Sequence, residues 1–142
     1  MSLFQVFFLF IYLLTQSPLE GTWKLKDFSG FDSLMRSRAF EELSEAKKLD
    51  AIQGMEFVLE NTVYSFHKDS VFFTNAGPDF SVSEKNGRFL VKSDTLIVFE
   101  FGKVNPIKFF ISSLSESELK LRFVVKDGGL GPTLMTFERV RE

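Results

Sequence analysis

The feature that most restricts the fold is a succession of short strand-like segments that fills the chain from residue 55 to residue 140. Several of these segments are apolar on both faces, since Ile97 and Phe99 alternate with Leu96 and Val98, so either both faces of the sheet are covered or the interior is a large apolar cavity. Turn-forming residues separate the segments at short intervals, so consecutive strands should pair antiparallel. The pattern predicts a mainly β fold, an antiparallel up-and-down β-barrel of about eight to nine strands, because closure leaves no sheet edge open.

Asn86-Gly87 is the strongest two-residue hairpin signal in this region, because both central residues of such a turn need a positive φ. We therefore expect one strand to end at Glu84 and the next to begin at Arg88. The predicted strand segments are MEFVLE (55–60), TVYSFH (62–67), VFFT (71–74), FSVSE (80–84), RFLVK (88–92), TLIVFEF (95–101), IKFFISS (107–113), ELKLRFVVK (118–126) and TLMTFERV (133–140).

A further strand and a helix precede these segments. Trp23 and Leu25 alternate with polar residues between positions 22 and 26, which predicts a half-buried strand. Apolar residues then recur at steps near 3.6, the period of an amphipathic helix. Asp32 or Ser33 can cap the start of this helix, and Gly54 can end it. We expect one helical lid segment between the first and second strands of the barrel.

An apolar run at the N-terminus predicts the cellular location of the protein. Residues 3–14 read LFQVFFLFIYLL, with Gln5 as the only polar residue. The run is too short to cross a bilayer, which takes about 20 residues, and it fits the apolar core of a signal peptide. We expect a signal peptide over residues 1–17 and a single barrel domain over residues 18–142. The protein would then be secreted, periplasmic or attached to the cell envelope, with no integral membrane domain in the mature chain.

Two features oppose cleavage after residue 17. No Lys or Arg precedes the apolar run, and Pro18 follows Ser17 directly. The alternative interpretation is a buried first strand or helix of the domain. Such an element would need apolar surroundings on every side, which a small barrel rarely provides.

Charge and cysteine content exclude several classes of function. The chain has 17 Lys and Arg against 19 Asp and Glu, a formal net charge of -2, so it has no basic field to neutralise nucleic-acid phosphates. It contains no Cys, which excludes disulfides, thiolate metal sites and Cys nucleophiles. A nucleic-acid partner is therefore not expected.

The sequence assembles no catalytic machinery that we recognise. His67 is the only histidine, and no Gly-x-Ser-x-Gly elbow accompanies a serine. A metal site would need His67 together with Asp69, Asp79 or Glu84 from different strands, which is a weak ligand set. We expect no enzymatic activity, no catalytic residues, no bound metal and no cofactor.

Short motifs, taken in order, resemble the calycin superfamily. Gly21-Thr22-Trp23-Lys24-Leu25 is similar to the Gly-x-Trp signature that opens the first strand of lipocalins and fatty-acid-binding proteins. Three later motifs, from residue 94 to residue 140, resemble the compact bacterial lipocalin-like domains. These motifs are Asp94-Thr95-Leu96, Glu118-Leu119-Lys120-Leu121 and Thr136-Phe137-Glu138-Arg139-Val140.

The lipocalin resemblance implies a structural group made of Gly21, Trp23 and Arg139. In that family the Trp packs across the closed end of the barrel, often against an Arg of the last strand. The fatty-acid-binding branch is the rival, because Phe31-Asp32 is similar to its entry into the helix. That branch holds a carboxylate with an Arg-x-Tyr pair on the last strand, where this chain has Met135 and Phe137.

The lipocalin resemblance also implies a small apolar ligand as the partner, held by aromatic side chains. Of the 19 Phe residues, 15 follow residue 17, enough to line a barrel or to fill it. The alternative is therefore a filled barrel that binds no small molecule and serves as a protein-protein interaction or structural domain. The candidate ligand-binding residues are Phe57, Tyr64, Phe66, Phe73, Phe89, Phe99, Phe109 and Phe123.

Overall fold

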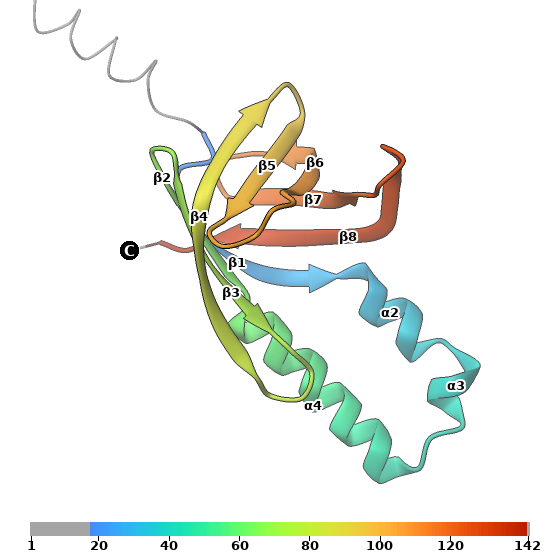
Figure 1. Ribbon diagram of the computed structural model, residues 1–142. Coiled ribbons are helices and arrows are strands. Elements are labelled where there is room, and N and C mark those ends of the chain that lie inside the picture. The colour runs from blue at the N-terminus through green and yellow to red at the C-terminus, as the bar shows by residue number, and fades with distance from the viewer. Residues whose placement is uncertain (1–17, 142) are drawn as a thin grey trace, which may run out of the picture.

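The computed structural model describes residues 18–141 as one antiparallel barrel with a helical segment at one end (Figure 1). Each strand pairs with its neighbour in sequence, and the last pairs with the first, so the sheet closes. The predicted fold class is confirmed. The strands are β1 (Gly21–Phe28), β2 (Val63–His67), β3 (Ser70–Ala76), β4 (Val82–Lys92), β5 (Thr95–Glu100), β6 (Ile107–Leu114), β7 (Glu118–Val124) and β8 (Leu130–Arg139).

The helical segment lies between the first two strands, as predicted, but it contains three helices instead of one. They are α2 (Ser29–Met35), α3 (Arg38–Glu41) and α4 (Glu45–Asn61). The predicted caps Asp32 and Ser33 lie inside α2. Ser37 and Ser44 cap α3 and α4 instead, since each hydroxyl accepts a hydrogen bond from the backbone amide three residues later.

The predicted strand MEFVLE is wrong, because α4 continues through it to Asn61. Gly54, expected to end the helix, is buried in its middle. A Cβ atom at this position would lie 2.6 Å from the carbonyl oxygen of Pro78 in the β3–β4 turn. The glycine therefore permits a close contact between α4 and the β3–β4 hairpin.

The hairpin predicted at Asn86-Gly87 is also wrong, because β4 runs straight through this dipeptide. Asn86 pairs with Phe72 on one side, and Gly87 pairs with Glu100 on the other. A Cβ atom on Gly87 would overlap the carbonyl oxygen of Phe99, so the glycine allows β4 and β5 to approach each other closely. With MEFVLE helical and two predicted strands fused, eight strands remain.

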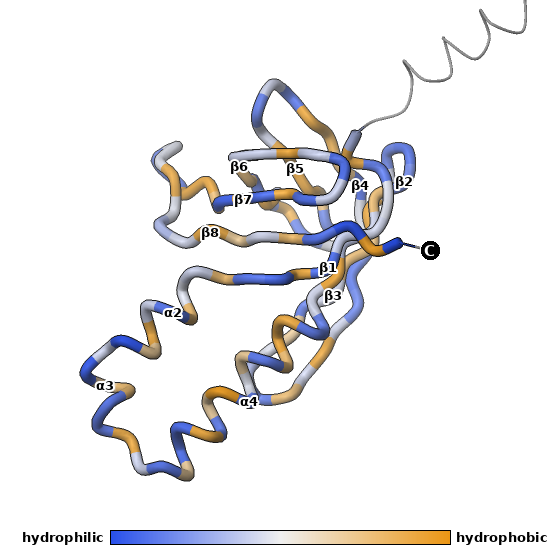
Figure 2. The backbone as a smooth tube through the Cα atoms, turned by 180° about the vertical axis from the view of Figure 1, so that it is seen from behind, coloured by the Kyte–Doolittle hydropathy of each residue, from blue (hydrophilic) through white to orange (hydrophobic). Residues whose placement is uncertain are grey.

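The helices and the β3–β4 hairpin extend away from the barrel together (Figures 1 and 2). The ring of Phe57 on α4 meets the ring of Phe80 in the hairpin turn at 5.2 Å between centroids. At the base of α4, the hydroxyl of Thr74 donates to the carbonyl of Asn61 and accepts from the amide of Val63. The segment thus projects from the barrel end and does not lie flat across it.

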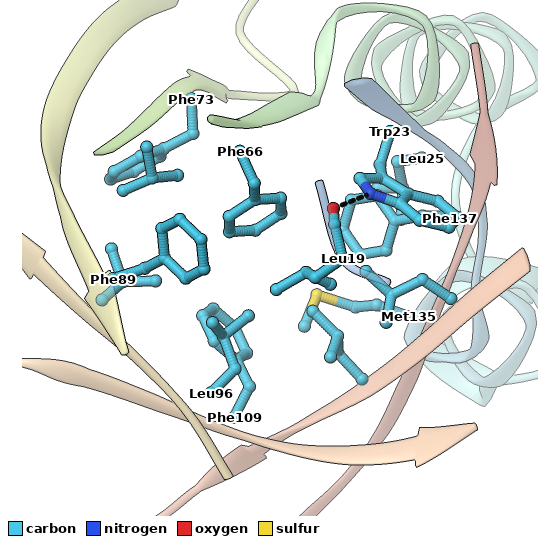
Figure 3. Close-up of a cluster of buried hydrophobic side chains, with 14 residues drawn as sticks. Leu19, Trp23, Leu25, Phe66, Phe73, Phe89, Leu96, Phe109, Met135 and Phe137 are labelled. Atoms are coloured by element: carbon cyan, nitrogen blue, oxygen red, sulfur yellow. Dashed lines mark hydrogen bonds between the residues drawn. The ribbon is translucent and has the colours of Figure 1, made fainter. Parts of the chain in front are cut away.

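One continuous apolar cluster fills the barrel below this end, and Figure 3 shows its rings and aliphatic side chains converging from opposite strands. Its residues come from every strand and from the segment before β1. The cluster consists of Leu19, Trp23, Leu25, Phe66, Val71, Phe73, Phe89, Leu96, Val98, Phe109, Leu119, Leu121, Met135 and Phe137.

Trp23 and Arg139 close the other end of the barrel, as the family resemblance implied. The guanidinium carbon of Arg139 lies 4.2 Å from the centroid of the indole, which is buried. Its nitrogens also donate to the backbone carbonyls of Pro18, Glu20 and Glu116. The Arg139 side chain therefore connects four parts of the fold: residues 18–20, β1, β8 and the β6–β7 turn.

Gly21 makes room for this arrangement. Its φ of +126° lies in a region that side chains rarely adopt. A Cβ atom there would also stand 2.5 Å from Nη1 of Arg139. The three residues of the predicted structural group, Gly21, Trp23 and Arg139, therefore meet at one place.

We predict that Arg139→Ala lowers the free energy of unfolding by about 2–4 kcal/mol, because it removes a cation–π contact and three charge-assisted hydrogen bonds. Urea denaturation measures this change. Arg139→Lys should recover part of the loss, since an ammonium retains the charge without the planar fork. Arg38→Ala is the control, because its exposed pair with Glu42 should contribute less than about 0.5 kcal/mol. Equal losses in the free energy of unfolding for Arg139→Ala and Arg38→Ala would contradict the role given to Arg139.

Candidate functional site

At the end of the barrel next to the helices, several inward-facing side chains are partly exposed, and we call these residues the mouth. Side chains directly opposite each other on paired strands share a face of the sheet. Buried Trp23 pairs with Tyr64, Tyr64 with Phe73, and Phe73 with Lys85, so all four face inward. By the same reasoning Glu100, Ile107 and Phe123 face inward. The mouth consists of Tyr64, Lys85, Glu100, Ile107 and Phe123.

Solvent reaches the mouth but not the core beneath it. The inward-facing ring of Phe123 is 42% exposed, whereas its paired neighbour Phe109 is 1% exposed. Lys85 and Glu100 retain 30% and 13% exposure of their side chains. The transition from exposed to buried occurs within one layer of side chains.

Aromatic rings form the floor of the mouth. The ring of Tyr64 stacks on Phe73 at 5.0 Å between centroids and meets Phe137 edge-on at 5.5 Å. Phe109 lies 6.3 Å from Tyr64 and 5.0 Å from Phe123. These contacts connect opposite sides of the barrel, and since Phe73, Phe109 and Phe137 are buried, Phe123 and part of Tyr64 form the aromatic surface that is exposed at the mouth.

An ion pair stands above this aromatic floor. Nζ of Lys85 lies 3.4 Å from Oε1 of Glu100, and both side chains point into the barrel. Burial of the Tyr64 hydroxyl, with a smaller contribution from the negative charge of Glu100, raises the pKa of Tyr64 to about 12. Tyr64 is therefore a neutral hydrogen-bond donor at physiological pH.

The structure separates the eight predicted ligand-binding residues into three groups. Phe66, Phe73, Phe89 and Phe109 are packed in the core. Tyr64 and Phe123 lie at the mouth. Phe57 and Phe99 lie outside the barrel interior, since Phe57 on α4 contacts Phe80 in the β3–β4 turn and Phe99 faces outward at 44% exposure. Ligand contact by any of them stays a prediction.

Sequence reasoning missed Lys85, Glu100 and Ile107. The hairpin expected at residues 86–87 placed Lys85 next to a turn, so its inward position in β4 was hidden. A strand pattern continued from Phe89 back to Lys85 in steps of two would have placed it on the buried face. A step of two from buried Val98 on β5 would have placed Glu100 on the buried face in the same way.

A separate cleft of about 350 Å³ lies near the closed end. None of the residues around it is aromatic, and serines and an aspartate supply much of its lining. The mouth offers ring contacts that this cleft does not. The cleft is lined by Pro18, Leu19, Val91, Ser93, Asp94, Ile111, Ser112, Ser113 and Leu114.

His67 lies at the end of β2, exposed, with Nδ1 3.6 Å from Oε1 of Glu20. Among residues 18–141, no cluster of three or more His, Asp or Glu is arranged to hold a metal ion. In the same part of the chain, no helix has both the length and the apolar character needed to span a membrane.

The raised pKa of Tyr64 predicts a loss of stability at high pH. The unfolded chain releases this proton near pH 10 and the folded chain near pH 12, so the free energy of unfolding should fall between these values. Tyr64→Phe should remove this component of the fall. Ultraviolet titration of wild type minus Tyr64→Phe measures the pKa directly.

Glu100→Gln should lower this pKa without returning it to 10, since burial is the larger cause. A Tyr64 pKa near 10 in the wild-type protein would contradict the geometry of the mouth.

Comparisons with known proteins agree with this architecture. The crystal structure of a lipocalin-like protein from Bacteroides uniformis ATCC 8492 matches with a TM-score of 0.51 and 17% identity, over 87% of this chain and 100% of that one. The crystal structure of an uncharacterized protein from Bacteroides eggerthii DSM 20697 matches with a TM-score of 0.50 and 12% identity, over 85% of this chain and 98% of that one. A search of curated proteins gives no match. The model of the lipocalin-like domain family matches residues 19–121, most of the described chain, and the chain therefore belongs to that family.

Proposed function

We propose that this protein is a secreted or envelope-associated binding protein that holds a small apolar ligand at the mouth of its barrel. The observation that carries the proposal is Phe123, an inward-facing aromatic side chain that is 42% exposed directly above a filled core. Contact with a ligand would remove this surface from water, which is favourable in proportion to the apolar area covered. The lipocalin-like family supports a binding type of protein.

The packing of the core limits how deep such a ligand can enter. Phe66, Phe73, Phe109 and Phe137 are each at most 2% exposed and meet one another or Tyr64 across the barrel. Protein interiors are close-packed, so a guest among these rings would have to displace them. The ligand is therefore proposed to lie on the aromatic floor, between the strand ends that frame the mouth.

A second candidate function is a protein-protein interaction domain, the alternative derived from the sequence. The outer face of β4 and β5 carries Leu90 and Phe99, which are about half exposed, and Phe101 follows at 64% exposure. Exposed apolar groups on one face favour contact with a protein. The filled core is compatible with this function as well, so the two candidates must be separated by experiment.

We also propose that the protein is not an enzyme. The polar groups at the mouth are a phenol, an ammonium and a carboxylate, and their arrangement supplies no nucleophile activated by a base. Binding needs only the aromatic floor and the polar groups above it.

We predict that Phe123→Ala weakens binding of N-phenyl-1-naphthylamine, an uncharged aromatic probe, by roughly tenfold, because one ring contact at the floor is lost. The rise in probe fluorescence on titration gives the dissociation constant. Phe99→Ala is a matched control, since its ring has nearly the same exposure, 44%, but faces outward. A loss confined to Phe99→Ala would support the interaction surface and contradict the mouth.

The proposed location rests on the apolar run at residues 3–14. Cleavage after residue 17 would leave intact the bond from Nη2 of Arg139 to the carbonyl oxygen of Pro18, 2.9 Å. On expression of the full chain in a bacterial host, we expect protein outside the cytoplasm with its N-terminus near Pro18, measured by intact mass. Cytoplasmic protein that keeps residues 1–17 would contradict this location.

A further inference from the structure

We propose that the mouth selects ligands whose polar end carries no net charge, such as an alcohol or an amide, over carboxylates and amines of the same apolar chain. This inference rests on the proposed function, because it concerns the same site. It is argued from the position of the Lys85–Glu100 pair inside the barrel.

The pair is placed so that an entering polar group meets both charges. Lys85 pairs with Phe73, and Glu100 pairs with Gly87, so the two side chains project inward from neighbouring strands two positions apart. Their charged atoms are 3.4 Å apart and only partly exposed. A ligand atom near Nζ of Lys85 therefore lies within a few ångströms of Oε1 of Glu100.

The two charges largely cancel for an ionic guest. A carboxylate is attracted by Lys85 and repelled by Glu100 at a similar distance, and an ammonium experiences the reverse. Either ion would lose part of its hydration shell in a partly buried site without full compensation. An uncharged hydroxyl loses less hydration and can still hydrogen-bond to the pair.

Tyr64 extends this neutral polar surface. Tyr64 pairs with Phe73, which pairs with Lys85, so Tyr64, Lys85 and Glu100 face inward from β2, β4 and β5. A neutral phenol donates one hydrogen bond and adds no charge.

At the mouth, β8 supplies no cation to change this balance, because its Arg139 lies over Trp23 at the closed end. The inward-facing positions 135 and 137 of β8 hold Met and Phe, both buried in the core cluster. A fatty-acid head group would therefore find Lys85 already paired, with no Arg from β8 beside it.

The test is displacement of N-phenyl-1-naphthylamine from the purified protein by decan-1-ol, decanoate and decylammonium at pH 7. We expect the alcohol to displace the probe at a concentration at least tenfold below either ion. Glu100→Gln leaves Lys85 unpaired and should improve decanoate relative to the alcohol by about tenfold. Lys85→Met leaves Glu100 unpaired and should do the same for decylammonium.

Two controls separate local charge from general effects. The exchange Lys85→Glu with Glu100→Lys keeps the mouth neutral, so it should retain the preference for the alcohol. Glu42→Gln removes one partner of an exposed ion pair on the helical segment and should change none of the three displacement curves. Circular dichroism of each variant verifies that it is folded.

Each result decides one of the two claims. Probe displacement with equal preference for alcohol and decanoate, or an unchanged preference in folded Glu100→Gln, would overturn the charge selection and leave binding at the mouth standing. Failure of the wild-type protein to bind the probe or any of the three compounds would overturn the proposed function, and the charge selection with it.

Discussion

The stacking of Arg139 on Trp23 is the interaction on which the rest of the structure depends. It joins the first and last strands where the sheet closes, and its hydrogen bonds fix Pro18, Glu20 and the β6–β7 turn at the same end. With one end sealed in this way, the opposite end is the side on which the barrel can exchange molecules with solvent.

The interior is divided into two layers with different roles. Below the level of Tyr64, buried rings and aliphatic side chains pack against one another, which stabilises the barrel and means that a guest among them would have to displace them. Above it, Phe123, Lys85 and Glu100 face inward and remain partly exposed. The aromatic content therefore both fills the barrel and forms a binding floor, two outcomes that the composition alone could not separate.

The sequence was sufficient for the fold class, because short strand-like segments follow one another with turn residues between them, and the alternation in a strand such as β7 depends on burial and not on distant contacts. It failed at Gly54 and Gly87, where the glycines permit close approach to Pro78 and Phe99, partners that only the folded chain brings near. The same failure hid the mouth, since the false hairpin removed Lys85 from its strand. Phe57 was placed on a strand for a related reason, because a segment of six residues with four apolar ones, MEFVLE, fits a helix as well as a strand.

The central claim is that a ligand sits at the mouth over a core that stays packed, and nuclear magnetic resonance tests it most directly. The single Trp23 is the reporter of the closed end, because its indole donates to the carbonyl of Leu19, a residue of the 350 Å³ cleft, at 2.8 Å. On titration with N-phenyl-1-naphthylamine, we expect shifts of the amide signals of Lys85, Ile107 and Phe123 with an unchanged indole signal. A shifted indole signal with unchanged amides at these three residues would contradict the account.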